Sequence, residues 1–201
     1  HQLFLVMRGI RRHQATYAQS SPKSPLTSYH LLVLFDFIDL RYSHVDTLML
    51  RTAVSFAFYG MLRVSEYTSS HCHSFDPEST LMSTDVHIYD GVVHIFIKKS
   101  KTDPFKIGST IRLARTFSRS CPVSCFHQFS TSRPSLSSRL SSAPLFSFSD
   151  GSFLTRSRLS TILRECFHDC SLSTHSFRVG GASAAASAGI SDAQIQILGR
   201  W

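Results

Sequence analysis

The chain has 201 residues, of which 42% are hydrophobic and 11% aromatic, so it can build one sizeable core, and overall disorder is excluded. Its 21 Lys and Arg residues against 13 Asp and Glu residues give a net charge of +8, which favours a polyanionic partner, nucleic acid or an acidic membrane surface. The five cysteines do not follow the framework of a small disulfide-rich domain, and we expect reduced, mostly buried thiols.

The apolar stretches are too short to cross a bilayer. Residues 53–62 (AVSFAFYGML) reach about half the necessary length. We therefore expect no membrane partner. Residues 13–26 are polar and contain two prolines, so we interpret residues 1–26 as an N-terminal segment and linker and residues 27–201 as one domain.

Two helices are expected after this linker. Apolar residues with helical spacing follow Thr27. The second helix starts at Ser43, whose hydroxyl can cap it, with Asp46 as a capping-box partner. It is apolar nearly all round up to Gly60, which is typical of a central buried helix.

A β-hairpin is expected next. Residues 86–89 and 92–97 flank Asp90-Gly91, a strong two-residue turn signal, and a third short strand is expected at residues 110–113. The basic segment KKSKTDPFKIG (residues 98–108) forms the turn between the last two strands.

Helices dominate the rest of the chain. We expect a short helix at residues 121–129, a serine-rich loop at 130–144 and a helix at 154–170. A helix of very small residues follows at 175–189, and a last one starts at Ser191. The predicted fold class is mainly α with a small antiparallel β-sheet (α+β).

Four short motifs stand out, namely LRVSE (residues 62–66), SKTDPF (100–105), HSFR (175–178) and LGRW (198–201). In this order and spacing they resemble the motifs of the tyrosine recombinase (phage integrase) family. The residues of these motifs are similar to those of eukaryotic, transposon-borne members of the family. The resemblance extends from about residue 8 to the end, and implies a tyrosine recombinase catalytic-domain fold.

The resemblance also implies a role for each matching residue. Arg63 and Arg178 match the two arginines that hold the non-bridging oxygens of the scissile phosphate, and Glu66 matches the acidic residue that orients the first. Lys101 matches the lysine that protonates the leaving 5′ oxygen. His175 matches the histidine that assists proton transfer, and Trp201 takes a place often held by a second histidine.

The chemistry is consistent with these residue types. Cleavage of a phosphodiester accumulates charge on the equatorial oxygens, and planar guanidinium groups match that geometry. Two arginines and a lysine can stabilise this charge without a metal ion, so we expect neither a metal nor a small-molecule cofactor. We see no carboxylate cluster suited to Mg²⁺.

Each residue also has a purely structural interpretation. Arg63 and Glu66 could form only a helical ion pair, and His175 could be a helix N-terminal histidine bonded to backbone. Trp201 could pack in the core. Lys99 is the rival of Lys101 if the register of the hairpin differs. The sequence His71-Cys72-His73, with two more histidines, lacks a recognised zinc spacing.

The nucleophile of the family is a tyrosine that lies a short helix beyond the LGRW motif. The six tyrosines all lie far upstream, at positions 17, 29, 42, 59, 67 and 89. We therefore expect a C-terminally truncated piece of a recombinase that forms no covalent intermediate by itself. The alternatives are a degraded or domesticated copy that binds DNA or another protein without chemistry, and a helical scaffold whose basic surface is incidental.

For the full-length protein, the resemblance implies a role in recombination or integration of mobile DNA. It implies double-stranded DNA as the partner, a synaptic tetramer as the homo-oligomer and a nuclear location.

Overall fold

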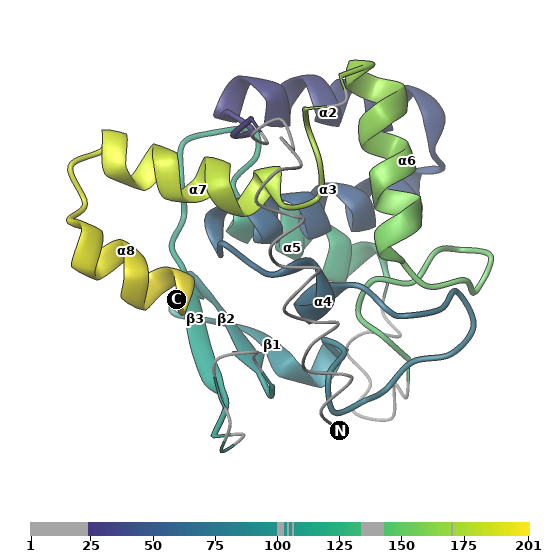
Figure 1. Ribbon diagram of the computed structural model, residues 1–201. Coiled ribbons are helices and arrows are strands. Elements are labelled where there is room, and N and C mark those ends of the chain that lie inside the picture. Colours follow the sequence, from purple (N-terminus) through teal and green to yellow (C-terminus); the bar gives the residue numbers. More distant parts are fainter. Residues whose placement is uncertain (1–23, 100–102, 104, 106, 134–142, 170) are drawn as a thin grey trace, which may run out of the picture.

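The computed structural model describes residues 24–99, 103, 105, 107–133, 143–169 and 171–201. Helices surround a central helix, and a small sheet lies to one side (Figure 1). The elements in chain order are α2 (Ser28–Arg41), α3 (His44–Tyr59), α4 (Val64–Tyr67), the 3-10 turn η1 (Ser83–Asp85), β1 (Val86–Tyr89), β2 (Val92–Ile97), β3 (Ser109–Leu113), α5 (Pro122–Ser132), α6 (Arg156–Phe167), α7 (Ser176–Ser187) and α8 (Asp192–Gly199). The expected fold class is confirmed.

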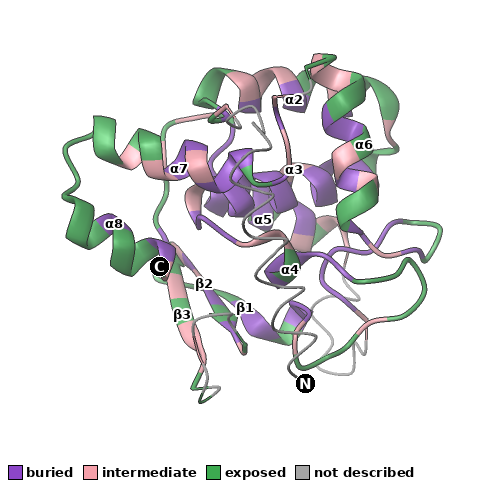
Figure 2. Cartoon of the chain, in the orientation of Figure 1, coloured by how far each residue is buried: buried purple, intermediate pink, exposed green. Residues whose placement is uncertain are grey.

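The central helix is α3, as its apolar sequence predicted. Twelve of its 16 residues are buried. It packs against α2, α5 and α7, and it is the most continuously buried helix in Figure 2. Its N-cap is Ser43, whose hydroxyl accepts a hydrogen bond from the Asp46 N–H.

The capping box expected at Ser43 is only half formed. The Asp46 carboxylate accepts the Ser43 hydroxyl, at 3.0 Å, and not its backbone N–H. The same carboxylate accepts the N–H and hydroxyl of Ser149, at 2.7 and 2.8 Å. This acid therefore ties the start of α3 to a loop about a hundred residues further along the chain.

The sheet is a three-stranded antiparallel meander in the order β1-β2-β3. Asp90 and Gly91 both have positive φ, 51° and 72°, as a two-residue hairpin turn requires. Alternate residues of β2 are buried, which places one face of the sheet against the core. The third strand starts at Ser109, one residue earlier than expected. Lys101, in the segment between β2 and β3, lies outside the described residues.

The later helices differ from expectation mainly at their ends. Helix α5 continues to Ser132, so the loop that follows is shorter than predicted, and residues 134–142 of that loop lie outside the described part. Helix α6 begins at Arg156 after the cap residue Thr155, and it ends before His168, which has a left-handed φ of 51°. Helix α8 has the expected capping box of Ser191 and Gln194.

Helix α7 packs closely on its neighbours, as its small residues suggested. A Cβ on Gly180 would lie 1.8 Å from the carbonyl oxygen of Leu26, and one on Gly181 would lie 2.1 Å from that of Phe58. Only glycine fits at these two positions without a shift of the backbone. This contact fixes the start of α7 against the end of α3.

None of the described helices is long and apolar enough to cross a membrane. The described cysteines are free thiols, with Cys121 and Cys125 buried, Cys166 partly buried and Cys72 exposed.

Candidate functional site

Arg63 lies where the chain turns out of the central helix. After the last turn of α3, Met61 adopts a left-handed φ of 46°, and Arg63 becomes the N-cap residue of the single-turn helix α4. The Arg63 N–H donates to Glu66 Oε2 at 2.8 Å, and its guanidinium donates to Glu66 Oε1 at 3.0 Å. The Glu66 side chain is only 2% exposed, so this pair is largely removed from water.

Arg178 comes from the first turn of α7 and is 2% exposed. Its Nη1 donates to the Met61 carbonyl at 2.5 Å, and its Nη2 donates to the Gly199 carbonyl. The guanidinium thus joins the α3–α4 turn to the end of α8. The glycine contacts of α7 hold the backbone from which this side chain extends.

Arg200 is a third arginine in the same place. It is the C-cap of α8, with a left-handed φ of 58°. Its Nη2 donates to Glu66 Oε2 at 2.8 Å, and its carbonyl accepts Arg63 Nη2 at 2.5 Å. We call Arg63, Arg178 and Arg200 the arginine cluster.

Arg200 was not expected to have a role, although the residue lies in the LGRW motif. Its partners, Glu66 and Arg63, are more than 130 positions away, so no local sequence signal indicates them.

The cluster holds more positive than negative charge. Glu66 is the single carboxylate that forms ion pairs with these arginines in the described part of the chain. Burial, together with the charges of Arg63 and Arg200, lowers the pKa of Arg178 to about 10, and Glu66 opposes this effect. Burial also lowers the pKa of Arg200, again against Glu66. Both pKa values are lowered chiefly because the guanidinium groups are buried, and the neighbouring arginines add to this effect.

Trp201 lies on the cluster and not in the core. The guanidinium carbon of Arg178 is 4.4 Å from the centre of the Trp201 ring, which is a cation–π contact. The side chain is half exposed, at 53%. The ring therefore covers one face of Arg178 and leaves its own other side open to a ligand.

The two residues expected to transfer protons are His175 and Lys101. His175 is the N-cap residue of α7, three positions before Arg178, and it is exposed with no capping hydrogen bond from its side chain. Lys101 lies outside the described residues. Its rival Lys99 follows the end of β2 and is exposed. The structure thus brings together Arg63, Glu66, Arg178 and Trp201 and adds Arg200.

No tyrosine hydroxyl of the described part accepts a hydrogen bond from Arg63, Arg178 or Arg200. Tyr67 is adjacent to Glu66 in sequence, but its hydroxyl is buried without a hydrogen-bond partner, and burial together with Glu66 raises its pKa. The Tyr59 hydroxyl is paired with Ser120. Among the described residues, no group of three or more His, Cys, Asp or Glu side chains could hold a metal ion.

The chain matches no protein-family model and no curated protein. It does match solved structures of tyrosine recombinases. One is the XerH site-specific recombinase bound to difH substrate, with a TM-score of 0.63, 14% identity, and coverage of 88% of this chain and 47% of that one. Another is a lambda integrase dimer bound to a COC′ core site, with a TM-score of 0.56, 17% identity and coverage of 90% and 46%.

A third is a complex of the Flpe W330F mutant with a DNA Holliday junction, with a TM-score of 0.55, 12% identity and coverage of 100% and 51%. The chain therefore spans about half the length of these solved chains. At such low identity the likeness concerns the fold, which is that of tyrosine recombinase catalytic domains.

Proposed function

We propose that this chain binds double-stranded DNA as a tyrosine-recombinase-like domain, and that the arginine cluster holds the phosphodiester at which a strand is broken. The observation that carries the proposal is three buried or half-buried arginines around one carboxylate. Burial and the charges of Arg63 and Arg200 lower the pKa of Arg178, so an anion bound beside the three guanidinium groups would favour their charged forms.

A phosphodiester is an anion that suits a group of guanidinium side chains. Its non-bridging oxygens lie in a geometry that guanidinium groups recognise with paired hydrogen bonds. The carbonyl contacts of Arg178 and the carboxylate contacts of Arg63 fix both groups before a ligand arrives. Such preorganised charge is the largest contribution that a protein makes to phosphoryl transfer without a metal ion.

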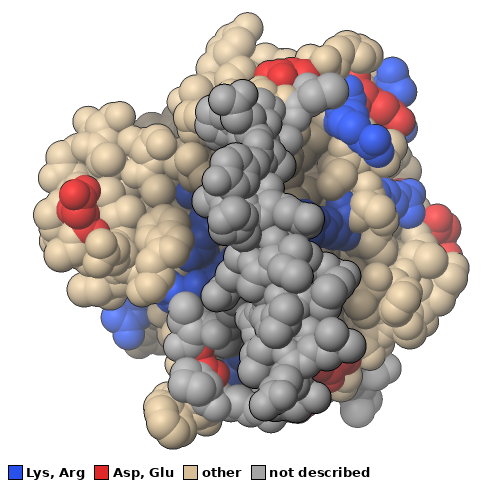
Figure 3. Space-filling view, viewed as in Figure 1, with Lys and Arg blue, Asp and Glu red and all other residues tan. Residues whose placement is uncertain are grey.

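The surface around the cluster supports the same partner. Figure 3 shows Lys and Arg side chains beside α7 and α8 and again below α6, with most acidic side chains nearer the edges of this face. The net charge is +8. The structural relatives named above are described as complexes with DNA.

The finer mechanism follows from the motif assignments. Arg63 and Arg178 stabilise the equatorial oxygens, Glu66 orients Arg63, and Trp201 covers Arg178. Lys101 protonates the 5′ oxygen that leaves, and His175 assists proton transfer at the attacking group, which is a tyrosine supplied by the full-length protein. The reaction is recombination or integration of mobile DNA. The residues of the motifs favour a eukaryotic, nuclear protein.

A second function is favoured by the tyrosines. Since no described tyrosine hydroxyl accepts a hydrogen bond from the cluster, and Tyr67 is buried with a raised pKa, the same site can hold a DNA phosphate without cleaving it. The domain would then be a DNA-binding or interaction module with a recombinase fold.

The binding step, common to both functions, can be tested with a labelled duplex of arbitrary sequence. Binding should weaken steeply as salt rises, because each neutralised phosphate releases counterions. Arg63→Ala should weaken binding and reduce the salt slope by about one. Arg41→Ala removes the same charge from an exposed ion pair on α2 and serves as the matched control. Equal affinities of the two variants, or binding that is insensitive to salt, would contradict the proposal.

A further inference from the structure

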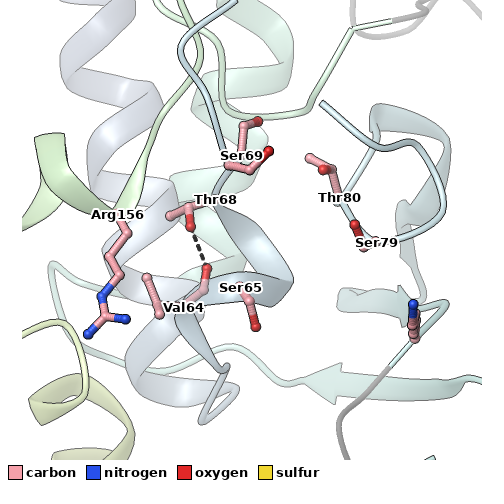
Figure 4. Close-up of a pocket in the computed structure, with 9 residues that line it drawn as sticks. Val64, Ser65, Thr68, Ser69, Ser79, Thr80 and Arg156 are labelled. Carbon is pink, nitrogen blue, oxygen red and sulfur yellow. Dashed lines mark hydrogen bonds between the residues drawn. The ribbon is translucent and has the colours of Figure 1, made fainter. Parts of the chain in front are cut away.

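A cavity lies beside α4, the helix that carries Glu66. It has a volume of about 620 Å³. Six of its nine described lining residues are Ser or Thr, two are the basic residues Lys99 and Arg156, and one is Val64. Figure 4 shows Arg156 on one side, Ser79 and Thr80 on the opposite side, and Ser65 of α4 between them.

The lining offers hydrogen-bond donors and positive charge. No Asp or Glu is among its described residues. Asp76, which does not line the cavity, accepts a hydrogen bond from the Ser79 hydroxyl at 2.9 Å. Hydroxyl, ammonium and guanidinium groups without a facing carboxylate form a typical environment for a phosphate group.

Two further observations point to a ligand. Ser69 is 4% exposed, and its hydroxyl has no hydrogen-bond partner in the described part of the chain. A buried hydroxyl is seldom left unpaired. In addition, Arg156 is the first residue of the 12-residue helix α6, whose N-terminal end attracts anions. Neither Arg156 nor Lys99 forms an ion pair within the described part.

The cavity and the arginine cluster share α4. Ser65 lines the cavity, Arg63 two residues earlier belongs to the cluster, and Glu66 forms ion pairs with the cluster. Because α4 is a single turn of helix, residues that line the cavity and residues that belong to or contact the cluster alternate along it. A DNA strand carries one phosphate per about 3.4 Å of helix axis, so one strand can reach both.

We propose that this cavity holds a second phosphodiester of the same DNA strand, next to the one held by the arginine cluster, with Arg156 and Ser65 as its principal contacts. This inference rests on the proposed function, because it requires that the cluster binds DNA. The cavity would fix the path of the strand, and so the register in which a phosphate enters the cluster.

The test is a double-mutant cycle on duplex binding, measured as affinity against salt concentration. Arg156→Ala should weaken binding about tenfold and reduce the salt slope by about one. Arg164→Ala, an exposed arginine two turns further along α6, is the matched control and should change neither quantity. Ser65→Ala should weaken binding about threefold with an unchanged slope, because it removes a neutral donor.

The decisive variant combines Arg63→Ala with Arg156→Ala. Two separate phosphates predict a slope reduced by about two and multiplied affinity losses. A reduction of only one would mean that both arginines contact the same phosphate, which overturns the inference while the proposed function stands. The inference is also overturned if Arg156→Ala binds DNA as Arg164→Ala does. It is overturned too if Arg156→Ala reduces the thermal stabilisation of the protein by inorganic phosphate but leaves DNA binding unchanged. Failure of the unchanged chain to bind DNA would remove both proposals.

Discussion

Glu66 is the residue on which the charge balance of the site depends. One oxygen of its carboxylate accepts the Arg63 guanidinium, and the other accepts Arg200 and the N–H of Arg63. The side chain is 2% exposed, so water does little to screen these contacts. A single negative charge thus joins the α3–α4 turn to the end of α8.

Replacing Glu66 by Gln should destabilise the protein by about 3 kcal/mol, because it leaves mutually repelling arginines without their buried counterion. Urea unfolding measures this difference. Sulfate should stabilise Glu66→Gln more than the unchanged chain, since an anion can replace the lost charge. Glu165→Gln, whose partner Arg41 lies 3.6 Å away in a solvent-exposed pair, should cost at most about 0.5 kcal/mol. Similar stabilities of the two variants would contradict the assigned role.

The sequence revealed these residues to different degrees. Arg63, Glu66 and Arg178 could be selected because their motifs combine charge with a fixed order along the chain. Arg200 could not be selected from the sequence, because the carboxylate that its side chain contacts, that of Glu66, is 134 positions away. The same holds for Asp46, whose bonds to Ser149 join positions 103 residues apart. Local patterns report local partners, and long-range polar pairs need the fold.

At the scale of elements, the placement of α7 decides whether Arg178 can reach the cluster. Gly180 lies against the backbone of Leu26 and Gly181 against that of Phe58, with no room for a side chain. The row of small residues predicted this close approach. The N-caps of α3 and α8, Ser43 and Ser191, were equally readable, because each depends on side chains within one turn. The end of α5 was not, because polar residues such as Ser130 can continue a helix or leave it.

Gly180→Ala tests the packing of α7. The added methyl would meet the Leu26 carbonyl at 1.8 Å, so the helix or the linker must shift. We expect a loss of about 2 kcal/mol or more in stability, measured by thermal unfolding, although alanine favours helices. Ser183→Ala, at an exposed position of the same helix, should be neutral or slightly stabilising. If Gly180→Ala were as stable as Ser183→Ala, close packing would not hold α7 in place.

At the scale of the whole molecule, the site is assembled from segments distant in sequence. The α3–α4 turn supplies Arg63, α7 supplies Arg178 and the end of α8 supplies Arg200, all around the end of one buried helix. The fold therefore supplies charge in a fixed place. Whether this charge serves cleavage or only binding depends on a nucleophile.

The chain of residues 1–201 should bind nicked duplex DNA without forming a covalent adduct. The two described tyrosines nearest to Arg63 in sequence are not available for attack: the Tyr67 hydroxyl is buried with a raised pKa, and the Tyr59 hydroxyl is bonded to Ser120. A hydroxyl that is inaccessible or engaged elsewhere cannot attack a phosphate held by the arginine cluster. The measurement is a denaturing gel with end-labelled DNA, and XerH with its difH substrate provides the positive control. An adduct that disappears in Arg63→Ala would show that a tyrosine within these residues reaches the phosphate, and would overturn this assignment.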